Sequence, residues 1–371
     1  MQVPYVAFRD WPVGITQQVE QEVTRVLREQ QFILGPDVQT FEDAFAKFLG
    51  AGFAIGVGSG FDALVLALKA VGVGPSDEVI IPANTFIATA NAVAQLGATP
   101  VLAEPDKLTY NLTADTAAKL ITTKTKAIVP VHLYGQTCQM DELMELCESY
   151  SLKLVEDAAQ AHGATYKNQF AGTFGDAAAF SFYPTKNLGA VGDGGAVVTS
   201  NPELASFVSM YRNYGQQEKY HHQLVGINSR LDTLQAAVLR IKLKYLRQQN
   251  KERQRLANQY LKELQGIGDL MLPVTAEYCS HVYHIFNIRT SRRNELKNYL
   301  QQKGIQTAIH YPVPIHLQPA YSYLKYKKGS LTITEEVANT SLSLPLFPGL
   351  SKAEQEYIIQ SVKAFFLNQD F

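Results

Sequence analysis

The spacing of apolar residues changes along the chain. Between about residues 15 and 50, apolar positions recur every three or four residues, which predicts two helices separated by the segment LGPD. Further along, short apolar runs alternate with helical patterns that predict helices near 61–71, 85–96, 114–121 and 139–150. The runs that predict strands are FAIGVG, DEVIIP, ATPVLAE, TKAIVPVHLY, LKLVEDA, DAAAFSFYP and GGAVVTS.

These strands and helices indicate an α/β sheet that is covered on both faces. Runs such as AIVPV and LKLVED are apolar on both sides, as in a parallel sheet between helices. Ligands of such open sheets bind at the carboxyl ends of the strands. Polar clusters follow five strands at that edge, namely Gly58–Gly60, Asn84–Phe86, His132–Tyr134, Asp157–Gln160 and Tyr183–Lys186. We therefore expect one site along this edge.

A second structural unit is predicted after the sheet. A helical run from residue 231 to about 264 begins with an apolar stripe and then becomes polar. It is followed by the strand-like HVYHIFNIRT, the helical SRRNELKNYLQQKG and a final helix from Lys352 to Leu367. We predict a large α/β domain at 1–245 and a smaller C-terminal α/β domain at 246–371, joined by the long helix 231–264.

Composition and charge narrow the classes of partner. Basic and acidic residues number 33 and 34, so the net charge of -1 gives no reason to expect nucleic acid or an anionic membrane as partner. No stretch is apolar enough to predict a spanning helix, and the start MQVPYVAFRDWPVG lacks the features of a secretion signal. The cysteines, which have no metal-type spacing and indicate a reduced, cytoplasmic protein, are Cys138, Cys147 and Cys279.

The segment FSFYPTKNLGAVGDGGA contains the first candidate for chemistry, Lys186. A lysine at a strand end is in most cases an ordinary surface residue. Burial among apolar neighbours, however, promotes the neutral amine, which is a nucleophile toward carbonyl groups. The glycines that follow allow a flat ring or a substrate to approach the backbone closely. Lys186 is therefore a candidate imine-forming residue.

Asp157 ends the buried strand LKLVED, and alternation places it and Glu156 on opposite sides of the sheet. A buried carboxylate needs a partner, because otherwise its pKa rises and it becomes neutral. One possible partner is an arginine. The other is a protonated pyridine nitrogen, as in pyridoxal phosphate enzymes.

The segment GVGSGFDALVLALKA follows a strand and opens a helix, so its backbone NH groups and positive helix end predict a phosphate site. A dinucleotide site is not favoured, since Phe61 occupies the position of the last glycine of that motif. Ser59 and Ser181 are candidate hydroxyl donors to the phosphate. A metal site is not favoured either, because His281 and His284 are three residues apart on a predicted strand and face opposite sides.

With these motifs identified, the chain resembles the DegT/DnrJ/StrS sugar-nucleotide aminotransferases of pyridoxal 5′-phosphate (PLP) fold type I. The resemblance extends from ILGPDVQTFEDAFAKFLG through VEDAAQAHG and GINSRLDTLQAAVLRIKL to IHYPVPIHLQPAY and SLSLPLFPGL. It implies an aspartate aminotransferase-like fold with a large, mostly parallel sheet and a smaller C-terminal domain. It also implies PLP as cofactor, pyridoxamine phosphate as its aminated form, and a homodimer with shared active sites.

The resemblance implies roles for individual residues. Lys186 is expected to form the covalent link to the PLP aldehyde, and Asp157 to pair with the pyridine nitrogen. Gln160 is expected near the ring hydroxyl, and Phe86 on the ring face. Residues expected at the phosphate are Ser59, Gly60, Ser181 and, reaching in from the neighbouring subunit, Asn228. Family members often carry threonine at the position of Phe61, so one hydroxyl contact to the phosphate is missing here.

The segments around Lys186, KYHHQLVGINSRLD and IHYPVPIHL resemble enzymes that aminate C3 of dTDP-linked 3-keto-6-deoxyhexoses. This implies transfer of the amino group of L-glutamate, giving a dTDP-3-amino-3,6-dideoxyhexose of gluco or galacto configuration for cell-surface or antibiotic glycans. Tyr183 and His310 are then expected at the reacting carbon, as further catalytic candidates. The substrate-binding candidates are Tyr183, His310, Tyr311 and, for the pyrophosphate, Arg212, Lys219 or Arg230.

Three alternatives stay open at this point. The first is an aminotransferase that acts at C4 of a nucleotide sugar, although such enzymes more often have histidine in place of Tyr183. The second is a PLP-dependent sugar dehydratase, in which histidine replaces the lysine. The third is a PLP-holding regulator, which would need a DNA-binding appendage or a basic patch.

Overall fold

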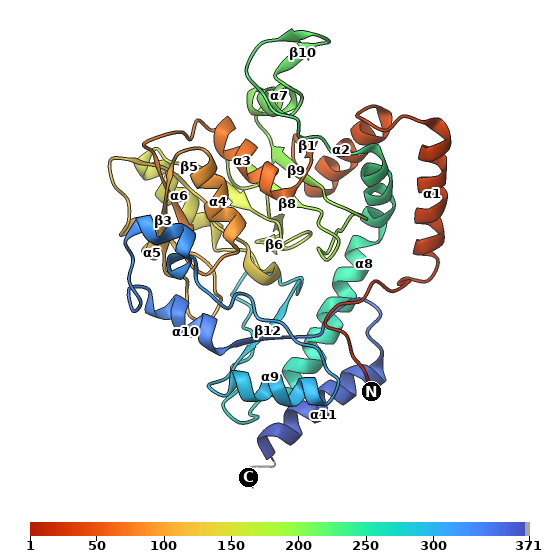
Figure 1. Ribbon diagram of the computed structural model, residues 1–371, viewed down its shortest axis with the longest axis vertical. Helices are drawn as coiled ribbons and strands as arrows, with labels where there is room; N and C mark the ends of the chain where they lie inside the picture. Colours follow the sequence, from red (N-terminus) through yellow and green to blue (C-terminus); the bar gives the residue numbers. More distant parts are fainter. Residues whose placement is uncertain (368–371) are drawn as a thin grey trace.

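The computed structural model describes residues 1–367, and its central element is a seven-stranded sheet with the order β1-β9-β8-β5-β4-β2-β3 (Figure 1). The five strands from β3 to β8 pair in parallel, whereas β9 runs antiparallel to both β1 and β8. The strands are β1 Phe53–Val57, β2 Glu78–Pro82, β3 Thr99–Ala103, β4 Thr125–Ile128, β5 Lys153–Asp157, β8 Ala177–Ser181 and β9 Gly195–Thr199.

Helices cover both faces of this sheet. One face packs against α3 (Gly60–Ala70), α4 (Ile87–Gln95) and α7 (Pro202–Tyr211) through a core of aliphatic side chains. The other face packs against helices that bury phenylalanine, leucine and methionine side chains. These helices are α2 Pro36–Leu49, α5 Ala114–Ala118, α6 Met140–Tyr150 and the start of α8. Because both faces are buried, most of these strands carry successive apolar residues that point to both sides of the sheet, as their sequences predict.

The helix α8 (Thr233–Leu264) runs from the sheet into a second core. Its first part packs on α2 and on α1 (Ile15–Glu29), and its last part contacts α11 (Lys352–Leu367). In Figure 1 this second core lies below the main sheet. It contains the antiparallel pair β12 Phe286–Arg289 and β13 Ser341–Leu344, together with α9 Arg293–Gln302; α10 Thr332–Thr340 precedes β13.

Both ends of the described chain meet in this second core. Val3 is 1% exposed, packs in the same cluster as Phe366 and pairs with Ile305 in an isolated bridge. The segment after Val3 then runs back toward the start of α1, as the red trace in Figure 1 shows. As a result, residues 6–11 pass between the two cores.

Short elements complete the chain. A hairpin formed by β10 Gln216–Glu218 and β11 His221–His222 projects beyond α7, and Tyr220 at its turn is 79% exposed (Figure 1). A second hairpin and three 3-10 helices lie in connecting segments, namely β6 Thr165–Tyr166, β7 Gln169–Phe170, η1 Leu133–Gly135, η2 Ile315–Leu317 and η3 Pro319–Leu324.

The predicted α/β fold with a mostly parallel sheet is confirmed, and the structure differs in detail. Of the strand-like HVYHIFNIRT, only Phe286–Arg289 forms a strand. The helix α7 was not predicted, although Asn201 caps it and Pro202 begins it. Among residues 1–367, no helix is long and apolar enough to cross a membrane.

Candidate active site

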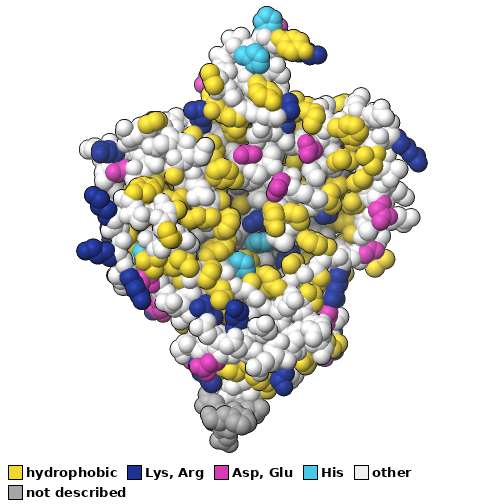
Figure 2. Space-filling view, in the orientation of Figure 1, with side chains coloured by type: hydrophobic (Ala, Val, Ile, Leu, Met, Phe, Trp, Pro, Cys, Tyr) yellow, Lys and Arg dark blue, Asp and Glu magenta, His cyan; other side chains and the backbone are white. Residues whose placement is uncertain are grey.

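The carboxyl ends of the parallel strands open into a cavity of about 510 Å³. Figure 2 shows a hollow near the middle of this face, with basic and histidine side chains inside it. Loops after β1, β2, β5 and β8 line the cavity on one side, and the segments around His284 and His310 line it on the other. It brings together most of the predicted site residues, which are Ser59, Gly60, Phe86, Asp157, Gln160, Ser181, Tyr183, Lys186, His310 and Tyr311.

Lys186 follows β8 in a turn, in which its backbone NH donates to the carbonyl of Tyr183 at 2.8 Å. Its side chain lines the cavity and is half-buried. Burial lowers the pKa of Lys186 to about 8, against the opposing influence of the negative charge on Asp157. A useful fraction of the amine is therefore neutral near pH 7–8, which is the form that attacks a carbonyl carbon.

Asp157 is the last residue of β5 and is 5% exposed. Its Oδ2 accepts a hydrogen bond from the hydroxyl of Thr89 at 2.8 Å, and its Oδ1 accepts one from the backbone NH of Ala159 at 3.2 Å. Burial raises the pKa of Asp157, whereas these two hydrogen bonds lower it. The partners seen here are a hydroxyl and an amide, so the carboxylate is left to pair with a ligand in the cavity.

The neighbouring Glu156 points to the opposite face of the sheet, as strand alternation requires, and is fully buried. Its two oxygens accept hydrogen bonds from the backbone NH groups of Gly172, Phe174 and Gly175 at 2.7–2.9 Å. The ring of His132 lies 2.8 Å from one of them. Glu156 is therefore a structural residue that anchors the end of β5.

The turn between β1 and α3 forms a cradle for an anion. Ser59 is the N-cap of α3 and accepts a hydrogen bond from the backbone NH of Asp62 at 3.1 Å. Gly60 lies so close to Ser181 that a Cβ atom at Gly60 would be 2.4 Å from the Cβ of Ser181. The two hydroxyls and the positive end of α3 therefore meet in one place, which suits a phosphate group.

Aromatic and amide groups form the walls of the cavity. Phe86 is 49% exposed, and its ring centroid lies 5.2 Å from that of Tyr311. The side chain of Gln160 is held at both ends, because its Oε1 accepts from the NH of Tyr134 at 2.7 Å and its Nε2 donates to the hydroxyl of Tyr311 at 3.1 Å. Phe86 thus presents an accessible ring face to a ligand.

Two histidines line the same cavity. His310 shares a hydrogen bond of 2.8 Å with the hydroxyl of Ser343, and burial, aided by the charge of Lys186, lowers the pKa of His310 to about 4. His284 lies 3.2 Å from the amide oxygen of Asn187, and burial lowers its pKa as well. Sequence reasoning placed His284 on a strand and missed it as a site residue, because β12 begins only at Phe286.

Four predicted residues lie outside this cavity. The prediction that Arg212 binds the pyrophosphate is wrong. The Arg212 guanidinium is buried and donates to Glu42 and to the carbonyl of Gly56, both at 2.5 Å. A guanidinium held inside the core in this way is not available to a substrate. The other three lie on the hairpin or at its base, with Lys219 and Asn228 exposed and Arg230 bonded to Asn213 at 2.9 Å.

The residues present fit PLP. A buried carboxylate for the pyridine nitrogen, a nucleophilic lysine, an exposed aromatic face and a phosphate cradle all border one cavity. Gly60 and Ser181 can lie this close together only because the glycine has no side chain. Among residues 1–367, no group of three or more His, Cys, Asp or Glu side chains is placed to hold a metal ion.

Comparisons with known proteins agree with this arrangement. Residues 14–363 match the model of the DegT/DnrJ/EryC1/StrS aminotransferase family. The dTDP-3-amino-3,4,6-trideoxy-alpha-D-glucose transaminase of Streptomyces venezuelae is 46% identical, over 97% of this chain and 95% of its own. The dTDP-3-amino-3,6-dideoxy-alpha-D-galactopyranose transaminase of Aneurinibacillus thermoaerophilus is 44% identical, over 98% and 99%.

Solved structures extend the likeness to three dimensions. The crystal structure of S. venezuelae DesV with a ketimine intermediate superposes with a TM-score of 0.97, at 46% identity and with all of both chains covered. Other solved relatives are described in PLP and pyridoxamine phosphate forms. The predicted family resemblance and cofactor are thereby confirmed.

Proposed function

The chain belongs to the DegT/DnrJ/EryC1/StrS aminotransferase family and is a PLP-dependent transaminase, and we propose that it moves the amino group of L-glutamate to C3 of a dTDP-3-keto-6-deoxyhexose. The observation that carries this proposal is the meeting of Lys186 and Asp157 in one cavity, in a chain more than 40% identical to two dTDP-3-amino-sugar transaminases. The product is then a dTDP-3-amino-3,6-dideoxyhexose.

The cofactor would be held by the groups described above. Ser59, Gly60 and Ser181 would hold its phosphate, Phe86 would cover its ring, and Asp157 would keep its pyridine nitrogen protonated. Bound in this way, PLP supplies an electron sink for the carbanion that forms at the substrate carbon. Asp157 stabilises that charge only while it is ionised, so the hydrogen bonds from Thr89 and Ala159 support the reaction.

Side chains of the protein would carry out the proton transfers. Lys186, as a free amine, would move a proton from the α carbon of the donor to the cofactor, and in the second half of the reaction from the cofactor to C3 of the acceptor sugar. Its pKa of about 8 suits both steps near neutral pH. His310 is neutral at that pH, so its ring can donate or accept a hydrogen bond at the sugar, and Tyr183, 52% exposed, borders the same space.

The nucleotide end of the substrate has two candidate cations. Lys219 and Arg230 lie on the projecting hairpin or at its base, outside the active-site cavity of their own chain. Either one can therefore reach a pyrophosphate only if the hairpin contacts an active-site cavity. The exposed position of Asn228, outside the cavity of its own chain, supports a homodimer in which this residue completes the phosphate site of a second copy. We propose that this dimer is cytoplasmic. Its product would be used for cell-surface glycans, such as O-antigen or S-layer sugars, or for antibiotic glycans.

The alternatives are less well supported. Amination at C4 is disfavoured by Tyr183 and by the C3 specificity in the names of both relatives. Dehydration is disfavoured because a lysine is present at position 186.

The test is an assay of L-glutamate with the two C4 epimers of dTDP-3-keto-6-deoxyhexose and, separately, with a dTDP-4-keto-6-deoxyhexose. We expect one 2-oxoglutarate per amino sugar, with the new amine at C3 by NMR. An amine at C4, or a dehydrated sugar without 2-oxoglutarate, would refute the proposal.

A further inference from the structure

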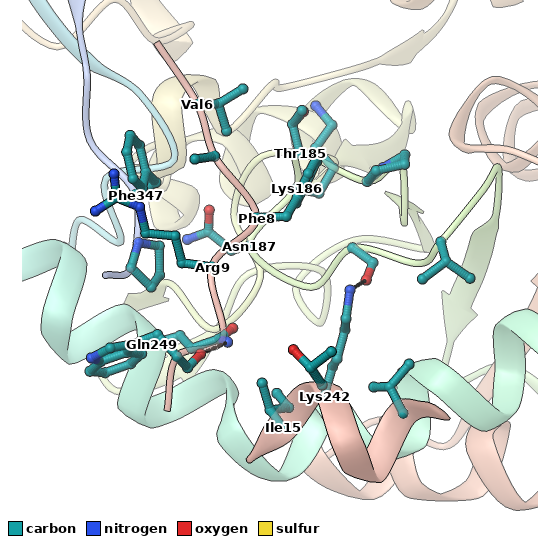
Figure 3. A pocket seen from close by; sticks show the side chains of 18 of the residues that line it. Val6, Phe8, Arg9, Ile15, Thr185, Lys186, Asn187, Lys242, Gln249 and Phe347 are labelled. Carbon is teal, nitrogen blue, oxygen red and sulfur yellow. Dashed lines mark hydrogen bonds between the residues drawn. The ribbon is translucent and has the colours of Figure 1, made fainter. Parts of the chain in front are cut away.

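Asn187 connects the turn that carries Lys186 to the helix α8. The side chains of both residues project from this turn, which Figure 3 shows from a smaller cavity that borders it on the side of the N-terminal segment. Asn187 is 5% exposed, and its Nδ2 donates to the carbonyl of Val282 at 3.1 Å and to Oδ1 of Asn250 at 2.9 Å. Both N–H groups of its amide are therefore used inside the protein.

These contacts fix the orientation of both amides. Asn250, on α8, is 6% exposed, and its Nδ2 donates to the backbone carbonyl of His162 at 2.8 Å. A carbonyl oxygen can only accept, so the Nδ2 of Asn250 must face His162 and its Oδ1 must face Asn187. The carbonyl of Val282 imposes the same requirement on Asn187. The amide oxygen of Asn187 is therefore left for the ring of His284.

The amide oxygen of Asn187 lies 3.2 Å from Nδ1 of His284. Because an amide oxygen has no hydrogen to donate, Nδ1 must carry the proton. Burial, aided by the positive charge of Lys186, holds the pKa of His284 well below its usual range, so the ring is neutral and Nε2 carries a lone pair. The pair of amides thus fixes one tautomer of a histidine that lines the active-site cavity.

The other histidine of the cavity, His310, is not constrained in this way. Its Nδ1 lies 2.8 Å from the hydroxyl of Ser343, and a hydroxyl can either donate or accept. The ring of His310 can therefore present an N–H group or a lone pair to a ligand. His284 can present only a lone pair, so the cavity contains one adaptable histidine and one fixed hydrogen-bond acceptor.

The walls of the cavity place this acceptor beside the substrate. Asp157 and the cradle at Gly60 and Ser181 belong to the wall formed by the strand ends, and they would hold the two ends of the cofactor there. His284 lines the opposite wall and is bonded to the residue that follows Lys186. A substrate that reacts next to Lys186 would therefore lie between the cofactor and His284.

We propose that His284 is a specificity-determining residue, whose Nε2 accepts a hydrogen bond from a hydroxyl group on a carbon adjacent to C3 of the nucleotide-linked sugar. The inference rests on the proposed function for the identity of the sugar. A sugar without that hydroxyl would leave Nε2 buried without a partner, which costs free energy. Glutamate carries no hydroxyl group, so the contact would serve only the half of the reaction that involves the sugar.

The first measurement concerns the tautomer and needs no substrate. Long-range proton–nitrogen NMR of the PLP-loaded protein, labelled with ¹⁵N-histidine, distinguishes a ring protonated at Nδ1 from one protonated at Nε2. The signal of His284 is assigned by its absence from the spectrum of His284→Asn. We expect a neutral ring with the proton on Nδ1 at pH 7. A proton on Nε2 would overturn the inference.

Two variants then separate the two ring nitrogens. The amide of asparagine reaches about as far as Nδ1, so His284→Asn can still donate to Asn187 but offers no acceptor to the cavity. The amide of glutamine reaches about as far as Nε2, so His284→Gln can offer its oxygen in place of the lone pair. Thermal melting shows whether each variant is folded.

The assay runs the sugar half of the reaction in reverse, from the dTDP-3-amino-3,6-dideoxyhexose that the protein accepts and from its 2-deoxy and 4-deoxy analogues. Stopped-flow absorbance of the cofactor gives the rate constant at low sugar concentration, and the half-reaction with L-glutamate is the control. We expect the original protein to react about tenfold more slowly with one of the two analogues, which identifies the hydroxyl. His284→Asn should lose about tenfold with the complete sugar but no more than about twofold with that analogue or with glutamate. His284→Gln should recover most of the loss.

Two kinetic outcomes would overturn the inference. One is equal reactivity of the original protein toward all three amino sugars. The other is an equal loss in His284→Asn for glutamate and for every sugar, because His284 would then position the cofactor or Lys186 instead of binding the sugar. A protein that reacts with glutamate but with none of these amino sugars would refute the proposed function, and with it the sugar hydroxyl as the donor. The NMR result would then still decide whether the tautomer of His284 is fixed.

Discussion

Replacing Thr89 by valine isolates one interaction of the candidate active site. The Thr89 hydroxyl donates to Asp157 Oδ2 at 2.8 Å, and Thr89 is 1% exposed. Valine has nearly the volume of threonine, so the change removes a hydrogen bond without opening a cavity. The hydroxyl of Thr85, 3.1 Å from that of Thr89, is left without this partner.

The expected size of the change in the pKa of Asp157 follows from the negative charge on this hydrogen-bond acceptor. A hydrogen bond to a charged group contributes about 1.5–3 kcal/mol, and about 1.4 kcal/mol corresponds to a tenfold change in proton affinity. Burial already raises the pKa of Asp157 and the bond from Thr89 opposes that rise, so its loss raises the pKa further. The carboxylate then protonates at higher pH, and the acid limb of the rate profile should move up by about one to two pH units.

The assay is the half-reaction with glutamate, followed by stopped-flow absorbance of the bound cofactor between pH 5 and pH 9. Thr89→Ser keeps a hydroxyl and should restore the original acid limb. A profile of Thr89→Val that superimposes on the profiles of Thr89→Ser and the unchanged protein would show that this hydroxyl does not support Asp157.

Three further predictions concern the same cavity. Lys186→Ala should abolish turnover and the visible absorbance of lysine-linked PLP. In the apoprotein, the rate of PLP attachment should increase with pH, with a midpoint near pH 8, the pKa of Lys186. Asp157→Asn should lower that midpoint, because it removes the negative charge that favours the ammonium form of Lys186. Gly60→Ala should weaken PLP binding at least tenfold by equilibrium dialysis, since its Cβ would lie 2.4 Å from Ser181, whereas Gly74→Ala, with open space around it, should not.

Much of the fold could be predicted from periodicity. The final helix has the predicted bounds Lys352–Leu367, and α8 begins at Thr233, two residues after the predicted start. Strand direction could not be predicted, because an apolar run such as GGAVVTS looks the same in a parallel and an antiparallel pair. The division at residues 245 and 246 stays a prediction, and limited proteolysis would test it.

Site residues could be predicted where a reactive side chain ends or follows a predicted strand. Asp157 is the last residue of β5 and Lys186 lies in the turn after β8, and both line the cavity. Arg212 was misjudged, because nothing local reveals that its guanidinium pairs with Glu42, 170 residues earlier in the chain. Thr89 was missed for the same reason, since an ordinary helical threonine gives no sign that its hydroxyl meets Asp157.

The two acids at the end of β5 make the orientation of Asp157 depend on a turn, residues 172–175, that does not line the candidate active site. Glu156 is fixed by the amides of Gly172, Phe174 and Gly175, and a slip of one residue in β5 would exchange its place with that of Asp157. The 172–175 turn therefore helps to fix the register that directs Asp157 into the cavity. Sequence drift in that turn should alter catalytic rate while leaving sugar preference untouched.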